Sequence, residues 1–135
     1  MANALYDLGR QGFLDGSIDW DTDNIKAVLV DTGAYTVNLA THQFLSDVAA
    51  GARISISGNL ASKTVAAGVA DAADVVFTAV TGATVEAIVI YKDTGTVGTS
   101  RLIAFIDTAT GLPLTPNGGD VTVAWDNGAN KIFKL

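Results

Sequence analysis

Four short segments rich in valine, isoleucine and aromatic residues dominate the second half of this chain. They are VEAIVIYKD (85–93), RLIAFID (101–107), DVTVAW (120–125) and KIFKL (131–135). The intervening DTGTVGTS, TATGLPLTPNGG and DNGAN consist almost wholly of turn-forming residues. Short β-branched and aromatic runs bounded by such turns are typical of antiparallel strands. This half of the chain therefore predicts a compact antiparallel β domain, in which 85–93 and 101–107 form a hairpin.

The first half adds further strands to this pattern. IKAVLVD (25–31) is almost entirely apolar and predicts a strand buried on both faces. ARISISG (52–58) alternates polar and apolar residues, and SKTVAAG (62–68) and DVVFTAV (74–80) also read as strands joined by the small-residue connection VADAAD (69–74). Seven or eight short strands at regular spacing predict an all-β, antiparallel sandwich or jelly-roll-like fold, in one domain spanning 1–135.

Two segments break the β pattern. Residues 3–14 predict a short helix with Asn3 as N-cap, although the glycines at 9 and 12 make it marginal without a surface to lie against. This segment is either a docking arm, extending to about residue 20, or a helix packed on its own domain. Residues 42–49 predict a second short helix, with Thr41 as a possible N-cap.

Composition and charge exclude several classes of function. The formal net charge of −6 disfavours binding to the phosphate backbone of nucleic acids. No apolar run approaches the ~18 residues of a membrane span, and the segment MANALYDLGRQG lacks the pattern of a secretory signal, so none is expected. Apolar residues make up 49% of the chain and charged residues only 16%, which favours apolar surface covered by other copies or by a partner.

The residues with catalytic potential do not form a recognisable motif. His42, the single histidine, has Ser46 and Asp47 close by on one short segment, but a catalytic relay normally converges from separate elements. Glu86 is the single glutamate, and a pair of carboxylates that includes it would be needed for a glycosidase-like reaction. The sequence predicts a protein that is not an enzyme.

The alternating carboxylates of Asp19, Asp21 and Asp23 imitate the start of a calcium-binding EF loop. The sixth position of such a loop should be glycine and is Asn24, and the twelfth should be a glutamate and is Val30. A solvated turn before a strand explains this segment better, and with one histidine and no cysteine a zinc site is also disfavoured. No metal or cofactor is expected.

Several segments together resemble a family of small virion structural proteins of tailed phages. They are IKAVLVDTGAYTVNLATHQFLSDV, VADAADVVFTAVTG, EAIVIYKDTGT, RLIAFIDTATGLPLTPNGGD and VAWDNGANKIFKL, which together cover most of the chain from Ile25 to Leu135. Within the family, the chain is most similar to capsid cement (decoration) proteins. No catalytic motif accompanies the similarity, and no residue role transfers beyond the strands.

The resemblance implies a capsid cement protein, made in the host cytoplasm and placed on the outer surface of the virion capsid. Its partners would be the major capsid protein and other copies of itself, as a dimer or trimer that stabilises contacts between capsid subunits. The alternative is a tail-fibre or tail-tip module that recognises a glycan on the host surface through the loops DTGTVGTS and TATGLPLTPNGG.

The docking-arm interpretation names the contact residues. Capsid and oligomer contacts are expected from Leu5, Tyr6, Leu8, Phe13 and Trp20, because buried aromatic and aliphatic anchors dominate most interfaces. It follows that deletion of residues 1–14 should leave a folded β domain that no longer binds empty shells.

Overall fold

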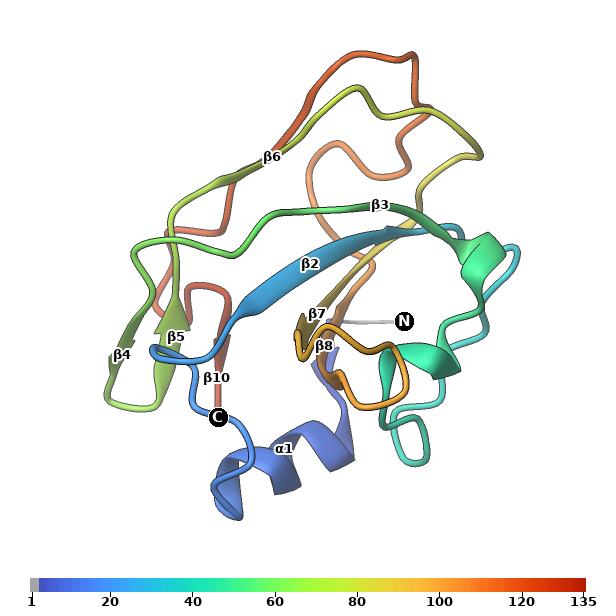
Figure 1. Ribbon diagram of the computed structural model, residues 1–135. Coiled ribbons are helices and arrows are strands. Elements are labelled where there is room, and N and C mark those ends of the chain that lie inside the picture. The colour runs from blue at the N-terminus through green and yellow to red at the C-terminus, as the bar shows by residue number, and fades with distance from the viewer. Residues whose placement is uncertain (1–2) are drawn as a thin grey trace.

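The computed structural model describes residues 3–135 and confirms an all-β, antiparallel sandwich (Figure 1). Its elements are β1 (Ala4–Leu5), α1 (Asp7–Leu14), β2 (Ile25–Val30), η1 (Leu45–Asp47), η2 (Ala50–Ala52), β3 (Arg53–Ile56), β4 (Thr64–Ala66), β5 (Val69–Asp71), β6 (Val75–Phe77), β7 (Ala87–Lys92), β8 (Arg101–Ile106), β9 (Val121–Val123) and β10 (Phe133–Lys134).

The strands form one large and two small antiparallel sheets. The main sheet has the order β1-β8-β7-β2-β3, the three-stranded sheet the order β10-β5-β4, and β6 pairs with β9. The predicted hairpin is confirmed, since β7 and β8 are antiparallel neighbours with Lys92 opposite Arg101. The segment 69–74, predicted as a connection, instead contains β5, which pairs with both β4 and β10.

The main sheet is buried on both faces, which explains why β2 and β7 are almost continuously apolar. One face packs against the irregular segment that contains Tyr35, Leu45 and Val48. The other face carries Ile25, Ala27, Leu29, Ile88 and Ile90 and packs against side chains of the two smaller sheets, including Ala70, Phe77 and Trp125. The alternation of side chains along each central strand thus supplies two cores.

The N-terminal segment belongs to the domain rather than to a separate arm. β1 extends the main sheet by pairing with β8, with Ala4 opposite Phe105, and the Tyr6 N–H donates to the Ile103 carbonyl over 2.9 Å. α1 follows at once and lies against β8, where a Cβ on Gly9 would come within 2.7 Å of the Leu102 carbonyl oxygen. Both glycines of α1 are buried, so they allow the close approach of helix and strand.

The start of α1 differs from the prediction, because Tyr6 and not Asn3 occupies the N-cap position. Asn3 instead ties the chain to the end of β8. Its Oδ1 accepts the N–H groups of Asp107 and Thr108, and its Nδ2 donates to the Thr108 carbonyl, each over 2.9 Å.

The predicted helix at 42–49 is wrong, because this segment forms only one short 3₁₀ turn, η1, and a second such turn, η2, follows it. Residues 43–45 are drawn out beside β8: the Leu102 N–H donates to the Gln43 carbonyl, and the Leu45 N–H donates to the Ser100 carbonyl. The Asp47 carboxylate then accepts the Gln43 and Phe44 N–H groups over 2.7 and 3.0 Å and closes a single turn. Pairing with a neighbouring strand thus outweighs the local helical spacing.

Candidate functional site

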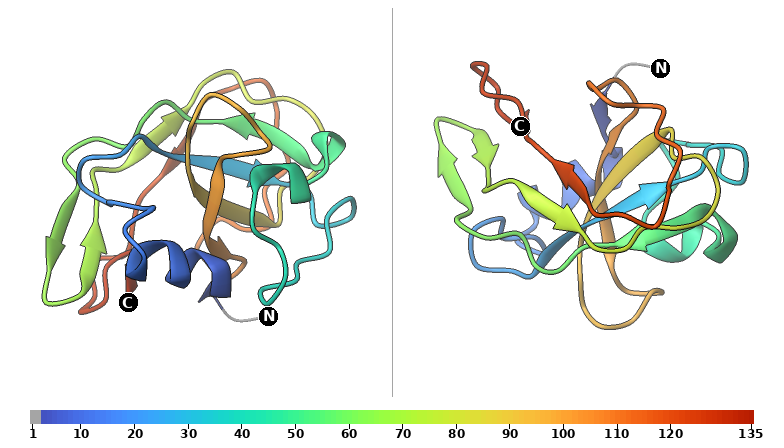
Figure 2. Two further views of the ribbon diagram at one scale, coloured as in Figure 1. Left: turned by 60° about the horizontal axis from the view of Figure 1, so that its bottom comes forward. Right: turned by 90° about the horizontal axis from the view of Figure 1, so that it is seen from above.

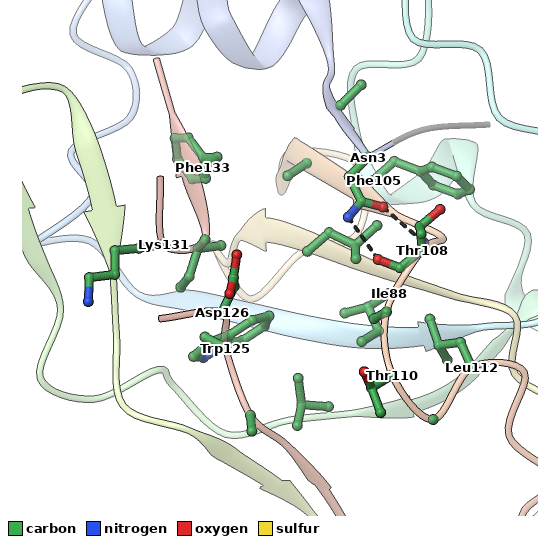
Figure 3. Close-up of a pocket in the computed structure, with 18 of the residues that line it drawn as sticks. Asn3, Ile88, Phe105, Thr108, Thr110, Leu112, Trp125, Asp126, Lys131 and Phe133 are labelled. Carbon is green, nitrogen blue, oxygen red and sulfur yellow. Dashed lines mark hydrogen bonds between the residues drawn. The ribbon is translucent and has the colours of Figure 1, made fainter. Parts of the chain in front are cut away.

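A cleft of about 890 Å³ opens between the main sheet and the C-terminal segment. We call it the C-terminal cleft. Its floor is the apolar face of the main sheet, with Leu29 and Ile88, and its walls are the segments 108–114, 121–126 and 130–134. In Figure 3, Asn3 and Thr108 are joined by two hydrogen bonds on one side, and Trp125, Asp126 and Phe133 lie on the other.

Trp125 is held rigidly in the wall of this cleft. Its backbone N–H donates to the Asp74 carboxylate over 3.0 Å, and its indole N–H donates to the Ala73 carbonyl over 3.0 Å. The ring therefore offers an apolar surface, while its single donor is already satisfied. The cleft combines an apolar floor with polar groups at its edge, a combination typical of small-molecule sites.

A second, smaller depression of about 410 Å³ lies between the end of α1 and the three-stranded sheet. We call it the α1 groove. Its floor is aromatic: the rings of Trp20 and Phe133 meet edge to face with centroids 5.2 Å apart, and Phe13 lies 5.8 Å from Phe133. Val65 and Leu135 line the groove and are 56% and 53% exposed, and Leu14, next to Phe13, is 84% exposed. Several apolar side chains are thus exposed on the surface at this end of the molecule.

The predicted contact residues lie mostly inside the protein. Leu5 and Trp20 belong to one core and Tyr6, with no exposed surface, to the other. Leu8 is half-buried and its carbonyl accepts the Arg101 guanidinium over 2.7 Å, while Phe13 is half-buried in the α1 groove. As surface contacts, Leu5, Tyr6 and Trp20 are therefore wrong, because their side chains stabilise the fold and do not reach a partner.

The exposed apolar residues Leu14, Val65 and Leu135 were not singled out by sequence reasoning. Leu14 is the last residue of α1 and directly follows Phe13, and its spacing does not show whether it faces the core or the solvent. Val65 stands in β4 and Leu135 directly follows β10, and the exposure of such residues depends on their position in the sheet, which a single sequence does not give.

The segment with alternating aspartates forms a turn. The Asp23 carboxylate accepts the Asp19 N–H over 2.8 Å and pairs with the Lys92 ammonium over 3.1 Å. The carboxyls of Asp19 and Asp21 share a hydrogen bond, which lowers the pKa of Asp19 and raises the pKa of Asp21. Within residues 3–135, no group of three or more side chains is arranged to hold a metal ion.

His42 is part of a hydrogen-bonded chain that does not include Ser46. Its Nδ1 accepts the Asn38 N–H over 3.2 Å, so the Tyr35 hydroxyl must donate to the same nitrogen, over 2.8 Å. The Tyr6 hydroxyl in turn donates to the Tyr35 oxygen over 2.9 Å. Burial raises the pKa of both tyrosines, which keeps the two hydroxyls protonated as donors. The chain anchors the segment 31–48 to the main sheet.

We expect Tyr35→Phe to lower the free energy of unfolding by about 1–3 kcal/mol, because it leaves the buried Tyr6 hydroxyl without its partner. The measurement is urea denaturation followed by circular dichroism. Tyr91→Phe is the matched control, since the Tyr91 hydroxyl has no hydrogen-bond partner among residues 3–135, and we expect a change below about 0.5 kcal/mol. Equal stabilities of the two variants would contradict the assignment.

Glu86 meets the carboxylate of Asp31 at the end of β2. Burial, followed by the negative charge of Asp31, raises the pKa of Glu86. The Glu86 Oε2 is enclosed and has no hydrogen-bond partner within residues 3–135, while Oε1 accepts a long hydrogen bond of 3.4 Å from the Thr32 hydroxyl. Neither carboxylate lines the C-terminal cleft or the α1 groove. Glu86 and Asp31 are thus neighbouring carboxylates, but neither depression would bring a substrate to them.

Glu86→Gln is expected to raise the melting temperature at pH 7, because it removes the repulsion from Asp31. A raised pKa means that the contribution of Glu86 to stability is fully present below its ordinary value of 4.5 and is lost as the pH rises through its folded value. The gain of the variant should therefore shrink as the pH falls toward 4. Asp126→Asn removes one carboxylate charge and keeps the oxygen that accepts the Gly128 N–H, so it controls for net charge. A Glu86→Gln variant no more stable than wild type at pH 7 would refute this assignment.

Comparisons of the sequence with models of known protein families and with curated proteins find no match. Among residues 3–135, no helix is long and apolar enough to cross a membrane.

Proposed function

We propose that this protein is a capsid cement protein of a tailed phage. In this role, a dimer or trimer binds the outer face of the shell and bridges neighbouring major capsid subunits. The resemblance of residues 25–135 to virion structural proteins supports the proposal, and so does a domain whose potential catalytic groups take part in structural hydrogen bonds.

The observation that carries the proposal is the apolar surface around the α1 groove. Val65 and Leu135 line the groove and expose about half of their surface beside its aromatic floor, and Leu14, which follows Phe13 at the end of α1, is 84% exposed. Clustered apolar side chains on a small protein mark a surface that another protein covers. We therefore assign the capsid contact to the α1 groove and to the neighbouring end of α1, with the exposed Leu14, and not to the buried Tyr6 and Trp20.

A rigid module with this surface suits adhesion to a repeating shell. One contact of this size is weak, but an oligomer that engages two or three subunits at once gains avidity by about 10²–10⁴ without new chemistry. Each bound copy then adds to the work needed to pull neighbouring subunits apart under the pressure of the packaged genome.

The test is the binding of the purified protein to shells that lack it, measured by co-sedimentation. Leu14→Asp should reduce shell occupancy at least about tenfold, because it places a charge in the apolar contact, while the melting temperature stays close to that of the wild type. Val97→Asp is the control, since Val97 is also exposed but lies in the β7–β8 loop. If the Leu14→Asp variant occupies the shells fully, the proposed contact is wrong. If the wild-type protein does not bind the shells, the proposed function is wrong.

The C-terminal cleft favours a second candidate function, that of a tail module for glycan recognition. The cleft is large enough for a small saccharide. Residues 108–114, the first part of the loop TATGLPLTPNGG predicted to recognise a glycan, form one of its walls. A glycan array with the purified protein tests the alternative. The number of copies per virion separates the two functions, because a shell component is present in hundreds of copies and a tail component in a handful.

A further inference from the structure

The strand β4 forms an unprotected edge of the three-stranded sheet. All three of its residues, Thr64, Val65 and Ala66, are exposed, and none carries a charge or is proline. Both views in Figure 2 show β4 as the outermost strand at one end of the molecule. Proteins usually protect such an edge with charges, prolines or a covering segment, because an open edge invites pairing with another strand.

The geometry of the β4–β5 hairpin decides which backbone groups point outward. Its loop is the two-residue turn Ala67-Gly68, and both residues have positive φ, 52° and 80°, as in a type I′ turn. Ala66 and Val69, which flank this turn, face each other and exchange backbone hydrogen bonds. In the next pair, Val65 and Ala70 do not, so the N–H and C=O of Val65 point away from β5 and into the solvent.

The side chains give this edge an unfinished apolar row. Phe133 lies opposite Ala70, and Ala70 lies opposite Val65, so the three side chains form one line across the three-stranded sheet. All three line the α1 groove. Ala70 is 4% exposed, whereas Val65 is 56% exposed, because the row has no neighbour beyond β4.

We infer that two copies of this chain pair through β4, antiparallel and around a two-fold axis at Val65. Each Val65 N–H donates to the Val65 carbonyl of the other copy, and the two three-stranded sheets join into one six-stranded sheet. The inference deepens the proposed function, on which it rests for its biological role, but the pairing itself is a property of the purified protein.

A second copy suits this edge better than an unrelated peptide. The two-fold axis places an uncharged valine opposite itself, so two chains that each carry a net charge of −6 meet without a carboxylate at the contact. The Lys63 ammonium is turned back onto the Asp23 carbonyl of its own chain and does not oppose its copy. The apolar row then continues from Val65 into the Val65 and Ala70 of the second copy.

The experiment is sedimentation equilibrium of the full chain over a range of concentrations. We expect a wild-type dimer in reversible exchange with the monomer. Val65→Pro removes the outward N–H and leaves the bonds to β5 intact, and Val65→Lys places two positive charges opposite each other. Each variant should raise the dissociation constant of the dimer at least about tenfold. Val76→Lys is the matched control, since Val76 is a similarly exposed valine on β6, and this variant should remain dimeric.

Melting temperatures show whether the variants fold. If Val65→Pro does not fold, Val65→Lys alone tests the dimer contact. A wild-type monomer at every concentration overturns the inference, as does a dimer that survives in a folded Val65→Lys variant, or a dimer broken by Val76→Lys alone. A dimer that is sensitive at Val65 but ignores shells supports the inference and removes the cement function. A wild-type monomer that decorates shells supports the cement function and removes the inference.

Discussion

A chain that lacks residues 1–14 is expected to show no cooperative unfolding transition. The deletion removes β1 from the edge of the main sheet and takes Leu5 and Tyr6 out of the two cores. Burial of one such side chain contributes about 1.5–3 kcal/mol. The loss of two of them, together with the helix that covers β8, approaches the total of about 5–15 kcal/mol that stabilises a typical domain.

Circular dichroism during thermal melting measures this directly. A truncated chain with a sharp transition near that of the full chain would refute the role assigned to β1 and α1, and would restore the segment as a separable arm.

Gly9→Ala tests the same contact in the full-length chain. Alanine is the better helix former by about 1 kcal/mol, but its Cβ would lie 2.7 Å from the Leu102 carbonyl oxygen. Overpacking against a backbone atom costs about 1–3 kcal/mol, so we expect net destabilisation. Gln11→Ala, on the exposed side of α1, should leave the stability within about 0.5 kcal/mol of the wild type.

The second large effect is expected for Trp20→Ala, with a loss of about 3–5 kcal/mol. Trp20 is 3% exposed, and its ring packs edge to face against Phe133 of β10. Its indole N–H donates to the Asp71 carbonyl of β5 over 3.0 Å. One side chain thus fastens the connection between α1 and β2 to two strands of the three-stranded sheet, and its removal leaves a cavity and breaks the hydrogen bond to the Asp71 carbonyl.

Urea denaturation gives the change in the free energy of unfolding. Trp20→Phe keeps part of the ring contact and should be the milder change, which preserves a measurement if the alanine variant does not fold. Leu14→Ala is the matched control: Leu14 is 84% exposed, and we expect a change below about 0.5 kcal/mol. A Trp20→Ala variant as stable as Leu14→Ala would show that Trp20 does not fasten the sheet.

The strands of the fold could be predicted from sequence because their signals are local. β2, β7 and β8 are long, β-branched and apolar, so the pattern predicts all three strands, and the turn residues between β7 and β8 also predict the pairing of these two. Some strands with weaker local signals were not predicted. β5 is a Val-Ala-Asp segment that becomes a strand only because β4 and β10 lie on either side of it.

The predicted contact surface failed for a related reason. An apolar residue in an amphipathic segment contacts either its own core or a partner, and the spacing is the same in both cases. Tyr6 and Trp20 are core residues because β8 and the three-stranded sheet, distant in sequence, cover them. Leu14 and Val65 are exposed because no other element reaches them, and such information is long-range.

The pairing of β1 with β8 also determines when the protein can fold during its synthesis. Ala4 meets Phe105, so about 100 residues must leave the ribosome before the first strand finds its neighbour. The apolar strand β2 also lacks its neighbour β7 during much of synthesis, because β7 lies in the second half of the chain. A nascent chain of this topology should fold after translation rather than during it, and should gain from chaperones when it is made rapidly in large amounts.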